Sequence, residues 1–138
     1  MYGELFADTN VILDLLIKRE PFHQDALQVF SMAEKGQISL SVSSLSFTTL
    51  DYFLKKEMGK TESRNVLIRL KSITRTLSVD EKIIERALAS QFDDFEDGVQ
   101  YYCALQHSAD IILTRNLKDF KTSDLPVLTP QQFIAMMK

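Results

Sequence analysis

Short apolar runs alternate along this chain with longer segments whose apolar residues recur at helical spacing. The short runs cover residues 5–7, 38–42, 76–79 and 111–114, and residues 126–128 form a candidate edge strand. Short apolar runs are typical of strands, and a period of about 3.6 residues is typical of helices. Strands that alternate with helices form a parallel sheet with helices on both faces. The pattern therefore predicts an α/β fold with a mainly parallel sheet of 4–5 strands.

Capping and turn residues divide the helical segments. A serine at 43 or 44, Asp80 and Thr129 stand where helices would begin, and Gly59 stands where one would end. No linker, internal repeat or low-complexity stretch interrupts the pattern, so we expect one domain over residues 1–138. The expected helices are residues 10–19, a segment opened by Pro21 and stopping at Gly36, residues 44–56, residues 61–70, a segment after Asp80, residues 95–107 and a final segment from Pro130.

The composition indicates the cellular location of this protein more clearly than its function. The chain has 138 residues, enough for one substantial core, and no apolar run approaches the roughly 20 residues that span a bilayer. The single cysteine, Cys103, favours a reducing, cytoplasmic location and a buried structural thiol. A net charge of -3 differs from the basic balance common in nucleic-acid-binding proteins. Acids at a metal site lower that total, however, and a bound cation reverses the local sign.

Acidic residues follow the predicted strands where a site is expected. Ligands bind beyond the carboxyl ends of the strands in an open parallel sheet. Asp8 directly follows the first strand, and Asn116 and Asp119 follow the fourth. Asp94 and Asp97 begin the helix that precedes the fourth strand, so they should lie at the same edge. We expect these side chains to form one acidic site.

Converging carboxylates imply a hard cation. Without nearby cations they repel one another, and oxygen ligands favour Mg²⁺ or Mn²⁺. Asp110 opens the fourth strand at the opposite edge of the sheet and is excluded from the site. His23 and His107 have no partner at ligand spacing, which argues against zinc.

Three segments of this chain resemble the motifs of PIN domains, a family that includes the VapC-type toxins. They read FADTNVILD at residues 6–14, DDFEDGVQ at residues 93–100 and ILTRNLKDF at residues 112–120. The resemblance covers essentially the whole chain, with the motifs in the family's order. It implies a three-layer α/β/α sandwich, metal-dependent cleavage of RNA, and a homodimer.

The same resemblance assigns roles by position. Asp8 and Asp97 would ligate the metal, Asp119 would complete the ligands and Asn116 would orient the site. Asp94 would support it. The residues expected to position water or metal ligands through hydrogen bonds are Thr9, Asn10 and Thr114.

One position departs from the family pattern. Many PIN nucleases have a glutamate early in the helix after the second strand, where this chain has Thr49. Asp51 lies about 200° further around that helix and is not a simple substitute. Two functions therefore stay open. One is a Mg²⁺- or Mn²⁺-dependent endoribonuclease, the toxin of a toxin–antitoxin pair; the other is a catalytically weak or inactive PIN module that binds RNA or a partner protein.

Basic residues beside the third motif suggest contacts to RNA. Arg115, Lys118 and Lys121 could bind backbone phosphates, and Arg115 is the predicted RNA-binding residue. Asp14 is expected on the surface or in support of its helix. The expected partners are RNA, a second copy of the chain and an antitoxin protein, with no membrane.

Overall fold

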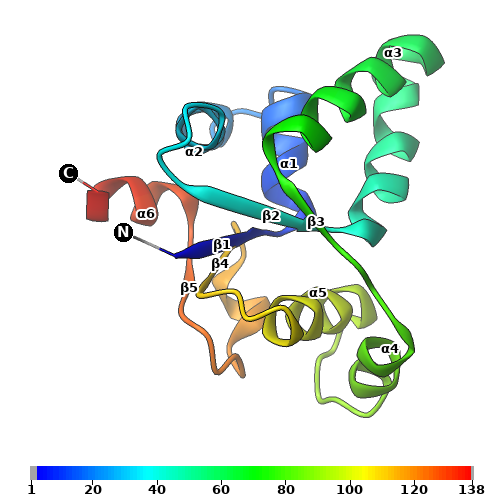
Figure 1. Cartoon of the computed structure of the whole chain (residues 1–138), viewed down its shortest axis with the longest axis vertical. Helices are drawn as coiled ribbons and strands as arrows, with labels where there is room; N and C mark the ends of the chain where they lie inside the picture. The colour runs from blue at the N-terminus through cyan, green and yellow to red at the C-terminus, as the bar shows by residue number, and fades with distance from the viewer. Residues whose placement is uncertain (1–2, 138) are drawn as a thin grey trace.

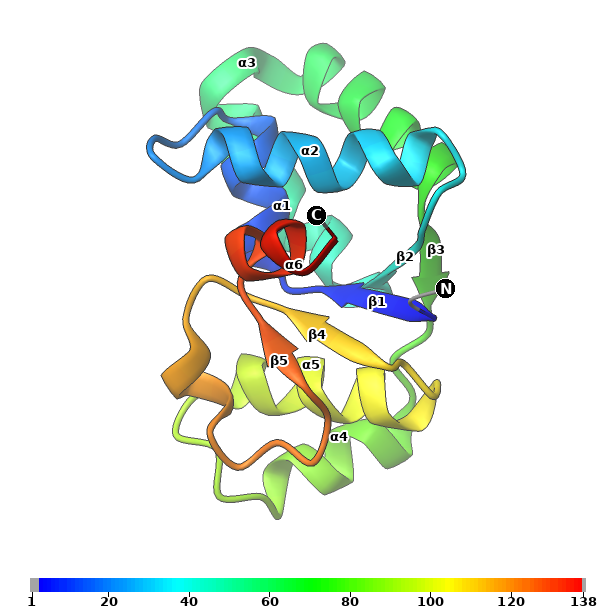
Figure 2. The same cartoon turned by 90° about the vertical axis from the view of Figure 1, so that its left-hand side faces the viewer.

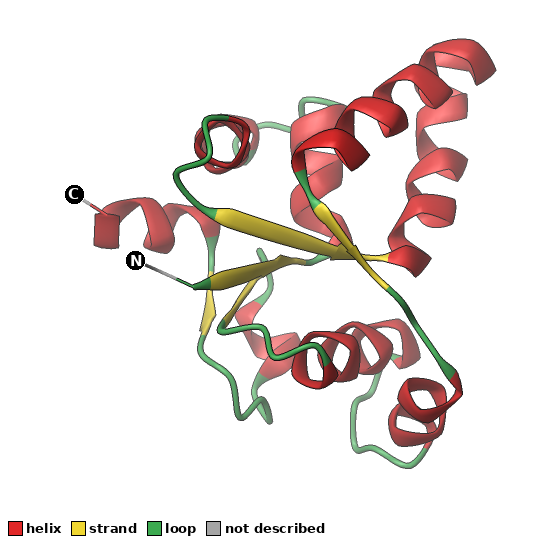
Figure 3. Cartoon of the chain, viewed as in Figure 1, coloured by secondary structure: helices red, strands yellow, loops and turns green. Residues whose placement is uncertain are grey.

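A sheet of parallel strands forms the centre of the computed structural model, which describes residues 3–137 (Figure 1, Figure 3). In this part of the chain five strands lie in the order β3-β2-β1-β4-β5, and all four neighbouring pairs are parallel. The sequence-based prediction of a parallel α/β sheet is confirmed. The one-domain prediction also included residues 1–2 and 138, which lie outside the described residues. The strands are β1 (Glu4–Ala7), β2 (Ser39–Ser43), β3 (Arg75–Leu77), β4 (Ile111–Leu113) and β5 (Val127–Leu128).

Helices cover both faces of the sheet, as Figure 2 shows. One face carries α1 (Thr9–Leu16), α2 (His23–Glu34), α3 (Ser44–Ile73) and α6 (Pro130–Met137), and the other carries α4 (Glu81–Leu88), α5 (Phe95–Gln106) and the short 3-10 helix η1 (Leu117–Phe120). The three-layer α/β/α sandwich is thus confirmed. No described helix combines the length and the apolar character that crossing a bilayer requires.

Strand β1 explains why the fold has two apolar cores. Successive side chains of a strand point to opposite faces. Leu5 and Ala7 pack into the cluster under α1, α2, α3 and α6, whereas Phe6 packs into the cluster under α4 and α5. All three are fully buried, as expected for a central strand covered on both sides. Cys103 lies in the second cluster, where burial raises the pKa of its thiol to about 12, so it is a structural residue as predicted.

Two predicted helix boundaries are wrong. The first helix ends at Leu16 rather than at residue 19, and Pro21 does not open the next one, which begins at His23. The amide of Arg19 instead donates to the carbonyl of Asp14, and Lys18 adopts a left-handed φ of 55°. A backbone turn therefore replaces the expected last helical turn.

Gly59 has the interrupting role that the sequence predicted. Its φ of 84° lies in the left-handed region that favours glycine, and it divides the long segment α3 into two helical parts. Predicted caps are also confirmed: the side chain of Ser43 accepts from Ser46 N, and that of Asp80 accepts from Ile83 N. Helices α1, α3 and α5 all begin at the carboxyl edge of the sheet, which determines where a site can form.

Candidate functional site

A hollow of about 180 Å³ at the carboxyl edge of the sheet contains three carboxylates. Asp8 follows β1, and Glu96 and Asp97 come from the first turn of α5. Predicted site residues on other elements line the same hollow, namely Thr9, Asn10 and Thr49. The structure therefore brings these predicted residues together at the carboxyl edge of the sheet.

A second hollow, of about 270 Å³, adjoins the first at Asp97, which lines both. Its other acidic side chains are Asp93, Asp94 and Asp119. Asp97 consequently lies between Asp8 on one side and Asp119 on the other.

Asp8 is held in place by two donors. Its side chain is buried; Oδ1 accepts from the amide of Thr9 at 2.9 Å and Oδ2 accepts from the hydroxyl of Thr114 at 3.0 Å. These bonds lower the pKa of Asp8, but burial outweighs them and raises it to about 6, with smaller contributions from Glu96 and Asp119. The supporting role predicted for Thr114 agrees with this contact.

Asp97 experiences the charges of four other acids at this edge. Burial is the largest cause that raises its pKa to about 7, and nearby carboxylates raise it further. Like charges shift a pKa in this way only when they lie close together. The side chains that act on it are Asp8, Asp94, Asp119 and Glu96. These five acids are thus close enough to influence one another's charge.

Glu96 is a site residue that the sequence analysis did not identify. Its Oε2 is buried and has no hydrogen-bond partner among the described residues, and burial, followed by the charge of Asp94, raises the pKa of its carboxyl. The sequence analysis placed Asp94 and Asp97 together at the start of this helix and did not consider Glu96 between them. Asp94 is instead the extended N-cap, whose side chain accepts from Asp97 N at 3.0 Å. Glu96 and Asp97 are then consecutive first-turn residues that both reach the hollow.

A hard divalent cation fits this set of side chains. Glu96 supplies an unpaired buried oxygen, and Asp8 and Asp97 supply carboxylates whose charges are unfavourable without a cation. Within residues 3–137, no three His, Cys, Asp or Glu side chains converge closely enough to enclose a metal ion. Mg²⁺ does not need such a cage, because it usually keeps several waters and binds one or two carboxylates. Ligation by Asp8, Asp97 and Asp119 together stays a prediction.

Thr9 supports the site through its backbone rather than its hydroxyl. Its Oγ1 lies 2.8 Å from the hydroxyl of Ser46 and accepts from Gln100 Nε2 at 2.7 Å, beneath the hollow. Gln100 also donates to Ser46 at 3.0 Å. This buried network ties α1, α3 and α5 together. The sequence offered no signal for Ser46 or Gln100, which are separated from each other by 54 residues.

The loop after β4 carries two further predicted residues. The backbone amide of Asn116 donates to the hydroxyl of Thr114 at 3.2 Å, and its backbone carbonyl accepts from Asp119 N at 3.1 Å. It therefore shapes the loop that presents Asp119. Asp110 lies at the other edge, where its carboxylate accepts from the amide of Glu4 at 2.7 Å, in agreement with its exclusion.

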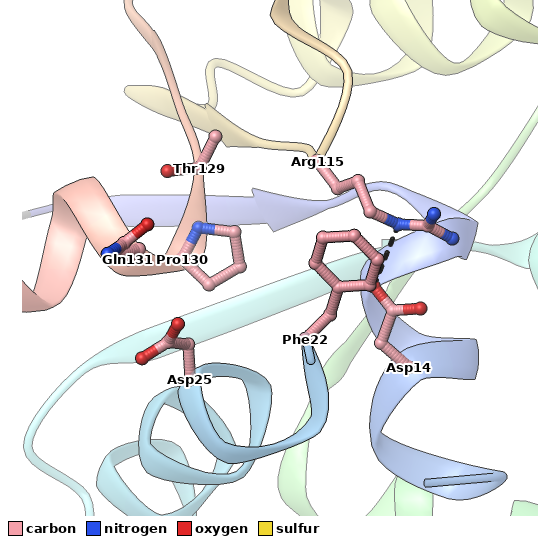
Figure 4. Close-up of a pocket in the computed structure, with 7 residues that line it drawn as sticks. All are labelled: Asp14, Phe22, Asp25, Arg115, Thr129, Pro130 and Gln131. Carbon is pink, nitrogen blue, oxygen red and sulfur yellow. Dashed lines mark hydrogen bonds and ion pairs between the residues drawn. The ribbon is translucent and has the colours of Figure 1, made fainter. Parts of the chain in front are cut away.

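Arg115 does not line either acidic hollow. Its Nε donates to Asp14 at 3.0 Å, and its guanidinium carbon lies 4.4 Å from the centroid of the Phe22 ring (Figure 4). These residues line a separate hollow of about 90 Å³ beside Pro130. Asp14 is buried instead of exposed, which corrects the expectation for that residue. The predicted RNA-binding arginine thus neutralises a buried acid.

The fold and the acidic edge define an α/β protein with several carboxylates gathered at one edge of a parallel sheet, and comparison with known families gives the family. A family model described as "PIN domain" matches residues 4–118. The chain belongs to the PIN domain family.

Several named proteins are similar to this chain over most of its length. Ribonuclease VapC1 of Aquifex aeolicus (strain VF5) is 28% identical over 135 residues, which cover 94% of this chain and 92% of that protein. A toxin–antitoxin complex from Klebsiella pneumoniae contains a chain that is 25% identical, with a TM-score of 0.68 and coverage of 91% of this chain and 97% of that one. VapBC-1 of nontypeable Haemophilus influenzae shares the fold at 18% identity, with a TM-score of 0.71 and coverage of 93% and 98%.

Proposed function

We propose that this protein is a metal-dependent endoribonuclease and the toxin of a toxin–antitoxin pair. The observation that carries the proposal is the convergence of Asp8, Glu96 and Asp97 on one hollow, with an unpaired buried oxygen on Glu96. The name of the relative, Ribonuclease VapC1, supports RNA as the substrate. The proposal includes Mg²⁺ or Mn²⁺ as the cofactor, a homodimer and a cytoplasmic location.

The residues have distinct tasks in this proposal. A bound Mg²⁺ or Mn²⁺ would supply the positive charge that stabilises a phosphate under attack. Thr114 and the Thr9 amide orient the carboxylate of Asp8, and Asp94 caps the helix that presents Asp97. Glu96 provides a carboxylate in the hollow that Thr49 also lines, so it takes the place of the family's missing glutamate.

Cleavage of a labelled RNA tests this function. The protein should cleave single-stranded RNA with Mg²⁺ or Mn²⁺ and lose that activity in EDTA. Asp8→Asn should remove most of it, because the variant retains the shape but not the charge of the side chain. Asp110→Asn is the matched control, since it makes the same change at the opposite edge and should cleave normally. Cleavage by Asp8→Asn in EDTA at the native rate would reject the proposal.

Thr49 motivates a second candidate, a catalytically weak module that binds RNA or a partner protein. The two candidates differ in what Glu96 does. If Glu96 replaces the missing acid, Glu96→Gln should reduce cleavage and Mn²⁺ affinity by at least about 10-fold. Glu96→Gln with Thr49→Glu should restore part of both, because a carboxylate returns to the same hollow. Calorimetry with Mn²⁺ measures the affinity. If the native protein does not cleave RNA and Glu96→Gln leaves the affinity for Mn²⁺ unchanged, the weak module is favoured.

An exposed apolar hollow supports the part of this proposal that concerns an antitoxin. It has a volume of about 480 Å³ and lies apart from the carboxylates. Its rim includes Leu27, whose side chain is 40% exposed, and such patches on a monomer are typical of protein interfaces. We propose that an apolar segment of an antitoxin binds here. The apolar walls come from three helices and comprise Leu15, Leu16, Leu27, Phe30, Val66, Leu70 and Ile73.

A further inference from the structure

Most basic side chains near the acidic edge already have a partner. Arg115 donates to Asp14 at 3.0 Å, and Arg19 lies 4.0 Å from the same carboxylate. On α3, the ammonium of Lys55 lies 3.3 Å from Asp51. Each of these cations thus has an acidic partner within the protein, although Arg19 also lines the 180 Å³ hollow.

Lys118 and Lys121 are different. Both are exposed, and both line the 270 Å³ hollow together with Asp97 and Asp119. Among residues 3–137, neither lysine side chain has a hydrogen-bond or ion-pair partner. Two lysines without a partner therefore line the hollow that Asp97 and Asp119, which the proposed function assigns to the metal, also line.

An aromatic hollow continues from this point. Its volume is about 370 Å³. It shares Gln91, Phe92 and Thr122 with the 270 Å³ hollow that the two lysines line, so the two hollows adjoin. The ring of Tyr102 meets Phe92 edge-on at 6.2 Å, and the guanidinium of Arg86 lies 4.8 Å from the centroid of the Tyr102 ring. Aromatic rings and guanidinium planes are the groups on which unpaired RNA bases stack.

We propose that Lys118 and Lys121 form a phosphate-binding subsite that carries the RNA strand from the carboxylates to the aromatic hollow, where a base binds against Phe92 or Tyr102. The identity of the strand as RNA rests on the proposed function. The order of groups along the surface is carboxylates, ammonium groups and then rings. That order suits consecutive parts of one nucleotide chain: a phosphate at the metal, a phosphate at the lysines and a base on the rings.

Binding of a fluorescent single-stranded RNA tests the subsite. In an Asp97→Asn background, which prevents cleavage, Lys118→Gln with Lys121→Gln should weaken binding at low salt by at least about 10-fold. The slope of log K against log salt should fall by about 1.4, because each phosphate contact to a single strand contributes about 0.7. Lys35→Gln with Lys71→Gln is the control, since it removes the same charge from two exposed positions outside both hollows. In the control, the affinity for RNA and the slope of log K against log salt should each change by no more than about 2-fold.

A photocrosslink tests the direction of the strand. RNA substituted with 5-iodouracil should react with the peptide that carries Phe92 or the one that carries Tyr102. The crosslink should disappear in the lysine double variant and persist in the control. Crosslinks confined to α1, α2 or α3 would overturn the proposed path.

The outcomes separate this inference from the proposed function. If the native protein cleaves RNA and the lysine double variant, in the Asp97→Asn background, binds RNA as the control does, the subsite is wrong and the nuclease function stands. If both double variants weaken binding equally, only bulk charge matters and the subsite is also wrong. If RNA binds through the lysines but no metal supports cleavage, the subsite stands and the nuclease function fails. Absence of RNA binding by the Asp97→Asn protein overturns the inference.

Discussion

Replacing Asp97 with asparagine is expected to abolish RNA cleavage and, at the same time, to stabilise the metal-free protein. Changes to groups that only orient metal ligands cost about 10- to 100-fold in affinity or activity, so loss of a direct ligand should cost at least about 100-fold. The stabilisation follows from the environment of the carboxyl. Burial and four neighbouring acids raise its pKa to about 7, which means that the folded protein disfavours its charge. Asparagine removes that charge with little change in shape.

The stabilisation by Asp97→Asn has a defined pH dependence. The carboxyl has an ordinary pKa of 3.8, so between that value and about 7 the folded protein keeps a proton that the unfolded chain has lost. Native stability therefore falls as pH rises through this range and levels off above it. Asparagine carries no such proton. The difference in melting temperature should be small near pH 4 and should reach a few degrees at pH 8.

Thermal unfolding in EDTA at several pH values measures this effect, and Mn²⁺ should then stabilise the native protein more than the variant. Asp110→Asn again serves as the control, because its carboxyl lies at the opposite edge of the sheet. Lower stability of Asp97→Asn than of the native protein at pH 8 in EDTA would contradict the account. Native activity in this variant would remove Asp97 from the site.

Replacing Arg115 with methionine is expected to cause the largest loss of stability of any change proposed. Asp14 has a side chain only 3% exposed, and Arg115 is its closest cation, at 3.0 Å. Burial raises the pKa of Asp14, and the charges of Arg115 and Arg19 offset this only in part. Loss of one partner from a buried ion pair typically costs 3–5 kcal/mol; because Arg115 is partly exposed, we expect about 3 kcal/mol.

Urea unfolding at neutral pH measures the loss in Arg115→Met. The double variant Asp14→Leu with Arg115→Met should recover most of the stability, because apolar residues can replace a buried ion pair at little cost. The loss should also shrink at acidic pH, where a protonated Asp14 no longer requires a cation. If Arg115→Met instead leaves stability unchanged and weakens RNA binding, Arg115 has the RNA-binding role that the sequence suggested.

The sequence predicted most of the architecture because local pattern and topology were consistent with each other. Apolar runs and helical periods located the strands, and the rule for parallel sheets placed Asp8, Asp97 and Asp119 at one edge. The errors lie at the end of the first helix, where a backbone turn through Lys18 ends the helix before residue 19. Periodicity cannot detect such a turn, because it reports the spacing of apolar side chains and not the backbone conformation at Lys18.

The amino-acid sequence by itself placed Asp8, Asp97 and Asp119 at the carboxyl edge, because each follows a parallel strand or begins a helix that starts at that edge. Only the tertiary structure decided which of the charged side chains are already paired within the protein and which are available to a ligand. Glu96 has an unpaired buried oxygen, Arg115 is paired with Asp14, and the side chains of Lys118 and Lys121 have no partner among the described residues. Such pairing depends on distances between segments as much as 101 residues apart, and residue type and spacing along the chain do not encode these distances.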